Sequence, residues 1–222
     1  MRDFLFASCV PALWIISAIH VLFMILLFTK YAKTKNILFL LSGLLTFGLF
    51  YDAMILALGS VMQESTAFFI LSKLRYILHG ALIPLIFALC AYALKAKGFW
   101  LKAVWGLTIV LSVLGIADGC IRELTVQTVA GVCRYADAGT APAFFQLINN
   151  LLTFGTVIPL MIVGIVVWVK QKTPFLFLAG FLMFAFSGLG AACLELMFYI
   201  SMYGEILMAL FFFLYAQKTS RS

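Results

Sequence analysis

An arginine and a histidine, Arg75 and His79, stand inside an apolar stretch of this 222-residue chain. With Ser72 they occupy positions i, i+3 and i+7, so the three side chains share one face of a helix. Burying charge in hydrocarbon is expensive, and such a face points toward partner groups rather than toward lipid. The spacing therefore predicts a polar helical face that meets groups from other helices.

Polar side chains in other apolar stretches fall at a comparable depth. At a rise of about 1.5 Å per residue, Arg75 lies about 12 Å below the end of its helix, and His79 about 18 Å. Asp52 lies about 10 Å below the corresponding end of the preceding helix. Together these residues predict a polar layer in one half of the bundle, made of Asp52, Arg75, His79, Asn149, Asn150, Glu195 and Glu205.

Three interpretations of this layer stay open. The residues line a pocket for a small polar ligand, or Asp52, His79 and Glu195 belong to a proton or ion path. In the third, a buried ion-pair network only fixes the register of the helices. In each case the simplest partner for Arg75 is Asp52 or Glu195, although a buried pair is weak evidence for stability.

The composition places these residues in a membrane. Hydrophobic residues make up 65% of the chain and charged residues 10%, against about 25% charged in a soluble domain. Several apolar runs reach the length of about 20 residues that spans a bilayer as a helix. Because open strands leave backbone groups unpaired in hydrocarbon, these runs are expected to be helices. The predicted fold class is all-α, a single polytopic bundle over residues 1–222.

Seven transmembrane helices are predicted, with one long loop between the fourth and the fifth. Their expected ranges are 6–29, 37–58, 67–94, 99–117, 142–169, 174–201 and 204–216, and the loop covers 118–141.

The lysines predict the orientation. Basic residues gather between the first and second helices, the third and fourth, and the fifth and sixth, and after the seventh, where Lys218 and Arg221 stand. Because basic loops stay in the cytoplasm, the N-terminus is expected outside, the C-terminus inside, and the polar layer in the outer half of a plasma membrane. The net charge of +7 is thus explained by topology and anionic lipid. The basic loops are short and lack interleaved aromatic residues, which disfavours a nucleic-acid partner.

Two cysteines, Cys120 and Cys133, fall in the long outer loop. Outside a plasma membrane they could form a disulfide that holds this loop over the bundle, or remain two free thiols.

Enzyme chemistry finds little support in the residues. With only His20 and His79, a three-histidine metal site within one chain is impossible. Acid–base work by Asp52 and Glu195 is conceivable, but no nucleophile motif accompanies them. No metal and no cofactor are predicted.

The third helix carries a family-like pattern over 22 residues, Leu71–Tyr92. It combines Leu74-Arg75-Tyr76, Gly80 and Pro84-Leu85 with Phe87-Ala88-Leu89 and Tyr92. This pattern resembles the third helix of the seven-helix sensor regions at the N-terminus of bacterial histidine kinases. The resemblance implies a sensing role, but no output domain follows the seventh helix in this sequence. A related chain would then act as a stand-alone module with a signalling partner protein.

The sequence therefore predicts a membrane protein that senses or binds a small molecule in its outer half, with the lipid bilayer as its surroundings. The alternatives are a small transporter or proton-coupled permease and, after it, an intramembrane lipid-modifying enzyme.

Overall fold

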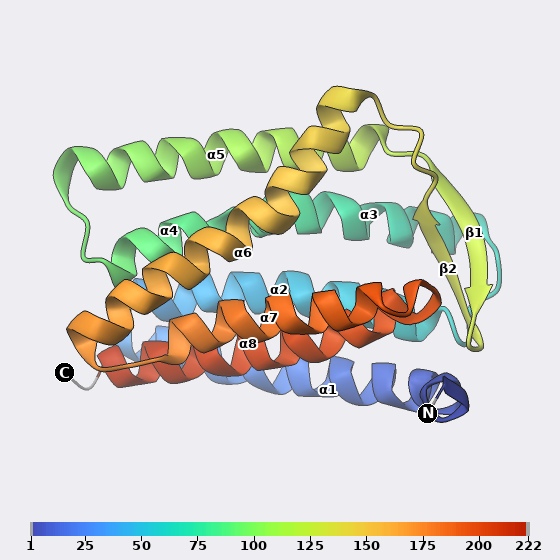
Figure 1. The fold of residues 1–222 in the computed structure, drawn as a ribbon, viewed down its shortest axis with the longest axis horizontal. Helices are drawn as coiled ribbons and strands as arrows, with labels where there is room; N and C mark the ends of the chain where they lie inside the picture. Colours follow the sequence, from blue (N-terminus) through green and yellow to red (C-terminus); the bar gives the residue numbers. More distant parts are fainter. Residues whose placement is uncertain (1, 221–222) are drawn as a thin grey trace.

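The computed structural model describes residues 2–220, which form an elongated helical bundle with a β-hairpin at one end (Figure 1). The helices are α1 (Arg2–Thr34), α2 (Ile37–Leu58), α3 (Thr66–Leu82), α4 (Leu85–Ala93), α5 (Gly98–Ile121), α6 (Ala143–Gln171), α7 (Phe175–Ala191) and α8 (Met197–Thr219). The hairpin consists of β1 (Leu124–Val129) and β2 (Val132–Asp137), and a short 3-10 turn, η1 (Leu194–Leu196), precedes α8.

Six helical segments of the described chain are long and apolar enough to cross a membrane, counting α3 with α4 and η1 with α8. The apolar helix α7, with 17 residues, is shorter. The protein is therefore a multi-pass helical membrane protein. Successive segments run back and forth, so the N-terminus lies at the hairpin end and the C-terminus at the opposite end (Figure 1).

The two halves of the bundle differ in their interiors. In the half that carries the C-terminus, here called the core half, a large cluster of buried apolar side chains joins α1, α2, α4, α6, α7 and α8. Leu41, Leu89 and Phe212 are each 1% exposed in it. The half that carries the hairpin, here called the hairpin half, holds a smaller apolar cluster between α1, α2, α8 and β2.

The third predicted helix, 67–94, is divided in the structure. Helix α3 ends at Leu82 and α4 begins at Leu85, because Pro84 has no N–H to continue the ladder. The Ser112 side chain of α5 donates a hydrogen bond to the Ala81 carbonyl beside the break, at 2.8 Å. A neighbouring hydroxyl thus pairs a carbonyl at the helix end, as membrane helices require.

The turn between the last two helices lies earlier than predicted. The sequence placed it near residues 202–203, but α7 ends at Ala191 and α8 begins at Met197. This moves Glu195 out of a helix and into the η1 turn, where it is exposed. It also moves Glu205 from a helix start into the body of α8, where the residue is 3% exposed.

The predicted outer loop, 118–141, is largely ordered structure. Helix α5 extends to Ile121, and the hairpin turns through Ala130 and Gly131, both with positive φ. Positive φ at both central residues is the pattern of a tight two-residue hairpin turn. The Cys133 N–H donates to the Gly59 carbonyl at 2.8 Å, which attaches the hairpin to the end of α2.

The predicted disulfide is not present. Cys120 lies on the last turn of α5 and is exposed, whereas Cys133 lies on β2, and both thiols are free. The prediction failed because it treated the segment as a pliable loop, while a helix end and a strand fix the two residues separately.

Glycines bring α3 and α5 into backbone contact. A Cβ added at Gly80 would lie 2.3 Å from the Gly115 carbonyl oxygen, and one at Gly115 would lie 2.4 Å from that of Gly80. One turn further, a Cβ at Gly119 would lie 2.8 Å from the backbone of Ile77. Small residues at this spacing are typical of tightly packed membrane helices. The contact holds the polar end of α5 against the polar face of α3.

Candidate functional site

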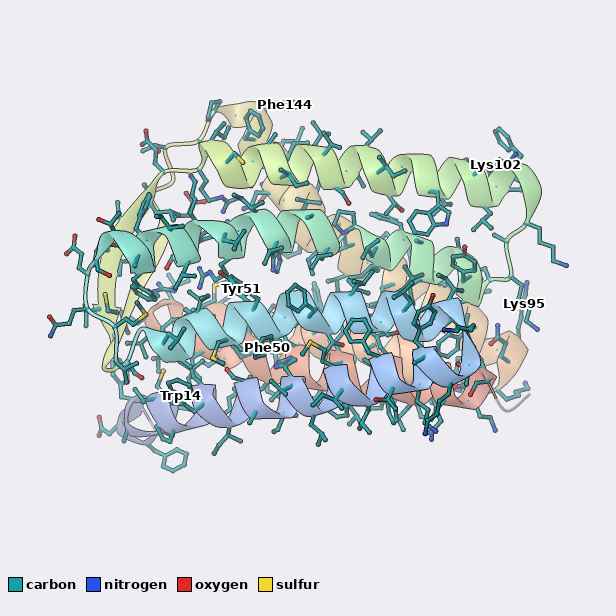
Figure 2. The ribbon with its side chains drawn as sticks, turned by 180° about the vertical axis from the view of Figure 1, so that it is seen from behind. Trp14, Phe50, Tyr51, Lys95, Lys102 and Phe144 are labelled. Carbon is teal, nitrogen blue, oxygen red and sulfur yellow. The ribbon has the colours of Figure 1, made fainter. Side chains whose placement is uncertain are left out.

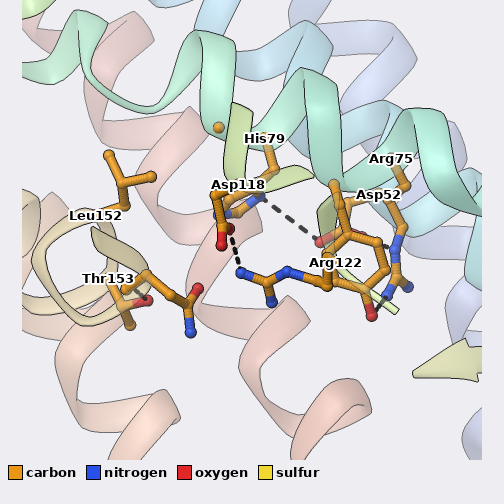
Figure 3. A pocket seen from close by; sticks show the side chains of 10 residues that line it. Asp52, Arg75, His79, Asp118, Arg122, Leu152 and Thr153 are labelled. Atoms are coloured by element: carbon orange, nitrogen blue, oxygen red, sulfur yellow. Dashed lines mark hydrogen bonds and ion pairs between the residues drawn. The ribbon is translucent and has the colours of Figure 1, made fainter. Parts of the chain in front are cut away.

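A cavity of about 190 Å³ lies in the hairpin half, between α2, α3, α5 and α6 (Figure 3). It is called here the central cavity. Its charged lining residues are Asp52, Arg75, Asp118 and Arg122, and His79 lies among them. The remaining lining residues are Tyr76, Gly80, Asn149, Leu152 and Thr153.

Asp52 interacts with both Arg75 and His79. Its Oδ1 lies 3.1 Å from Arg75 Nε, and its Oδ2 lies 4.0 Å from His79 Nδ1. The Arg75 and Asp52 side chains are 11% and 15% exposed, whereas the His79 side chain is 40% exposed. Of the two acids considered as partners for Arg75, Asp52 on the neighbouring helix thus forms the ion pair, and the imidazole remains accessible from the cavity.

Tyr76 links the ion pair to the hairpin. Its hydroxyl accepts a hydrogen bond from Arg75 Nη2 at 2.8 Å and donates one to the Tyr135 carbonyl of β2 at 3.2 Å. The guanidinium carbons of Arg75 and Arg122 lie 4.6 and 5.0 Å from the centre of its ring. Contacts of this kind between a cation and an aromatic face are attractive. The ring therefore helps to hold two like charges within one site.

A second ion-pair cluster, which the sequence analysis did not identify, centres on Arg122. Its guanidinium pairs with Asp118 one turn earlier on α5 and with Asp137 of β2, the latter at 2.8 Å between Nη1 and Oδ2. The Arg122 carbonyl also accepts a hydrogen bond from Lys73 of α3. The i, i+4 spacing of Asp118 and Arg122 signals such a pair on a helix, but the sequence analysis placed both residues in a loop.

The hairpin contributes a further cation. Arg134 of β2 donates to the Gln127 side chain at 2.8 Å, and its guanidinium lies 4.3 Å from the centre of the Phe198 ring. Burial lowers the pKa of the Arg134 guanidinium, and the nearby Arg75 charge acts in the same direction. Arg134 does not line the central cavity, so its charge lies beside the site rather than within it.

A second cavity, of about 200 Å³, adjoins the first. Asp118, Arg122 and Asn149 line both. The additional lining residues are Asp137, Gly139, Ala141, Phe145, Gln146 and Asn150. The two cavities together are called the chamber below. Its polar wall on α6 carries amides, whereas the walls on α3 and α5 carry charges.

The other predicted site residues divide into three cases. Asn149 lines both cavities, and Asn150 lines the second from an exposed position. Glu205 is buried in α8, close enough to Asp52 and Arg75 for their charges to interact. Glu195, in the turn after α7, was predicted to share the polar layer but lies at the exposed end of the bundle.

His20, interpreted as a packing residue, is fully buried in α1 and contacts the backbone of Glu205. Its Nδ1 lies 3.0 Å from the Ile16 carbonyl of its own helix. The Nε2 of His20 and the Oε2 of Glu205 are both buried without a hydrogen-bond partner. Titratable groups therefore continue from the chamber wall at Asp52 toward the interface of α1 and α8.

A scan against protein-family models gives no match for the chain, and a search of curated proteins returns none either.

Proposed function

We propose that this protein binds a small polar ligand in the chamber and serves as a sensing module of the plasma membrane. The observation that carries the proposal is a cavity within the membrane-spanning bundle whose lining includes two arginines, two aspartates and a histidine. Ionisable side chains inside a membrane protein are costly and mark functional sites by default.

The chamber contains more empty volume than a purely structural ion-pair network would leave. A network that only fixed helix register would close around its charges, because buried charges require complete pairing. Here each cavity, at about 190 and 200 Å³, far exceeds the roughly 10–15 Å³ that one water requires. The His79 side chain is 40% exposed beside a carboxylate that is 15% exposed. These features favour an occupied site over a purely structural one.

The proposed topology has seven crossings, with the N-terminus and the hairpin outside and the C-terminus in the cytoplasm. Figure 2 shows Lys95 and Lys102 at the end of the bundle away from the hairpin, the end at which the chain terminates. Short basic loops at one end support a cytoplasmic location of that end. Arg221, which the sequence argument also used, lies outside the described residues. Labelling of an otherwise cysteine-free Lys97→Cys variant with a membrane-impermeant thiol reagent tests the orientation. Labelling from outside intact cells contradicts it.

The binding proposal is tested by thermal unfolding of the purified chain in nanodiscs with millimolar sugars, dicarboxylates, amines, amino acids and nucleosides. A ligand at 100 times its Kd stabilises a protein by about 2.7 kcal/mol, or about 5–10 °C in Tm at this chain length. We expect at least one class to give such a shift.

Thr153→Trp places a large ring in the central cavity and is expected to abolish the shift. Phe154→Trp is the matched control, because Phe154 is the next residue on α6 and is 51% exposed. The proposal fails if no class raises the Tm, or if the shift survives Thr153→Trp.

The sensing part of the proposal is supported by the resemblance of Leu71–Tyr92 to histidine-kinase sensor helices. It predicts that deleting the gene changes the phosphorylation of a histidine kinase or response regulator in the same cell. Phosphoproteomics of wild-type and deletion strains, with and without the stabilising ligand, measures this. Ligand-driven flux into proteoliposomes without any phosphorylation change would instead make the protein a transporter.

A further inference from the structure

The chamber has a definite electrostatic pattern. Three carboxylates line it, on Asp52, Asp118 and Asp137, and two guanidinium groups, on Arg75 and Arg122. Arg75 is committed to Asp52 and Tyr76 at the α2 wall. Arg122 and Asp118 border both cavities, so their ion pair stands in the middle of the chamber. Any ligand that spans the chamber meets both signs of charge.

Two polar atoms of this central pair have no hydrogen-bond partner, and they are of opposite kinds. Asp118 Oδ1 is an acceptor and Arg122 Nε is a donor. Both atoms are buried, in residues that are 4% and 7% exposed. An unpaired buried polar group costs about 1–3 kcal/mol, and more when it is charged. A ligand that donates to the carboxylate and accepts from the guanidinium, after a small shift of the two side chains, removes both costs.

From these two atoms and the charged walls, we propose that the chamber ligand is a small zwitterion of the α-amino carboxylate class. Its ammonium group binds Asp118 and Asp137, and its carboxylate binds Arg122 and the accessible imidazole of His79. The side chains of Asn149 and Asn150 on α6 complete the polar contacts. This inference rests on the proposed ligand-binding function and names its substrate class.

Other ligand classes match the chamber less well. A simple anion would pair with Arg122 but face three carboxylates, whereas a simple amine would face two guanidinium groups. A sugar could satisfy both unpaired atoms, but only with neutral hydroxyls. Hydrogen bonds in which the ligand group carries the complementary charge are shorter and roughly twice as strong as neutral ones.

Isothermal titration calorimetry on the full chain in nanodiscs tests the proposed ligand class by comparing a series of related ligands. The probes are the protein amino acids, together with acetate, which carries only the carboxylate, and methylamine, which carries only the ammonium group. We expect saturable binding of at least one amino acid. Its methyl ester and its N-acetyl derivative, which each lack one charge, are expected to bind at least tenfold more weakly.

The outcomes separate this inference from the function on which it rests. If the ester, the N-acetyl derivative, acetate or methylamine binds as tightly as the amino acid, the zwitterion inference is overturned. If only another class, such as a sugar, binds in a manner that Thr153→Trp abolishes, this inference fails and the proposed function stands. If no class binds, both fail.

A variant tests the assignment of the two ends. Asp118→Asn retains the shape and leaves Asp137 to pair with Arg122, so the chain is expected to remain folded. The variant should bind the amino acid at least tenfold more weakly than the parent does. It should lose affinity by a similar factor for the N-methylamide of the amino acid, which keeps the ammonium group but lacks the carboxylate. An N-acetyl derivative, which lacks the ammonium group, should be nearly unaffected. Equal loss for all three contradicts the assignment of the ammonium group to Asp118.

Discussion

The core half and the hairpin half of the bundle differ in what fills the space between their helices. Around Phe212 the helices meet through apolar side chains that exclude solvent. Around Arg122 the helices leave the chamber between them, and its walls carry charge. The core half thus holds the helices together through apolar packing, and the hairpin half offers polar groups to a ligand. The same division explains why polar residues in this chain are so unevenly distributed.

The largest expected effect comes from breaking the ion pair in the hairpin half. Asp52→Ala leaves the Arg75 guanidinium buried without its acid, which typically costs about 3–5 kcal/mol. The double variant Asp52→Ala/Arg75→Leu is expected to recover most of that loss, because it removes the unpaired charge. Chemical denaturation in detergent measures all three proteins. A single variant as stable as the parent would show that the pair is solvated and that the hairpin half is not a buried polar site.

In the core half, Phe212→Ala is expected to cost about 3–5 kcal/mol, at or slightly below the first effect, because it opens a cavity in a packed cluster. Ligand affinity should remain unchanged, since Phe212 belongs to the core half. Phe181→Ala, at a position 43% exposed, is the control and should cost much less. Loss of ligand affinity in Phe212→Ala, with the fold intact, would contradict the division into two halves.

Between the halves, Gly115→Ala tests the contact that positions α5. Its Cβ would meet the Gly80 carbonyl, which is backbone and cannot rotate away. We expect a loss of about 1–3 kcal/mol and weaker ligand binding, because Asp118 and Arg122 shift with the helix. Gly106→Ala on the same helix meets nothing within 4 Å and should be neutral or stabilising. Unchanged stability in Gly115→Ala would rule out the close contact of α3 and α5.

The smallest effect is expected at the cysteines of the hairpin half. Because Cys120 and Cys133 are free, Cys120→Ser and a reducing agent should each leave the Tm within about 1 °C, an effect well below 1 kcal/mol for a chain of this length. Differential scanning fluorimetry with and without reductant measures this. If a reductant lowered the Tm of the parent but not that of Cys120→Ser, the disulfide between Cys120 and Cys133 would form in the protein after all.

The sequence predicted the helical membrane class and most helix positions, because long apolar runs have few alternatives in hydrocarbon. Asp52, Arg75 and His79 come together because helical spacing and the cost of unpaired charge constrain them strongly. Glu195 was misplaced because the run 175–216 contains no proline and no cluster of polar residues at its turn. Nothing local distinguishes Ala191 from Ser201 as the end of a helix.

Asp118 and Arg122 were missed for a different reason. The helix was expected to end at residue 117, so their i, i+4 spacing was not read as a helical pair. The spacing of Gly115 and Gly119 was the available signal that α5 continues in close contact with a neighbour. Asp137 offered no such signal, because its position depends on the register of a hairpin, and that register is set by the turn at Ala130 and Gly131.

The break at Pro84 also has a mechanical consequence. It divides one membrane crossing into two levers, with α3 attached to α5 through Gly80 and α4 anchored in the core half through Ile86 and Leu89. Because α3 lines the chamber and α4 does not, a change of angle at this joint would alter the width of the chamber without requiring α4 to repack.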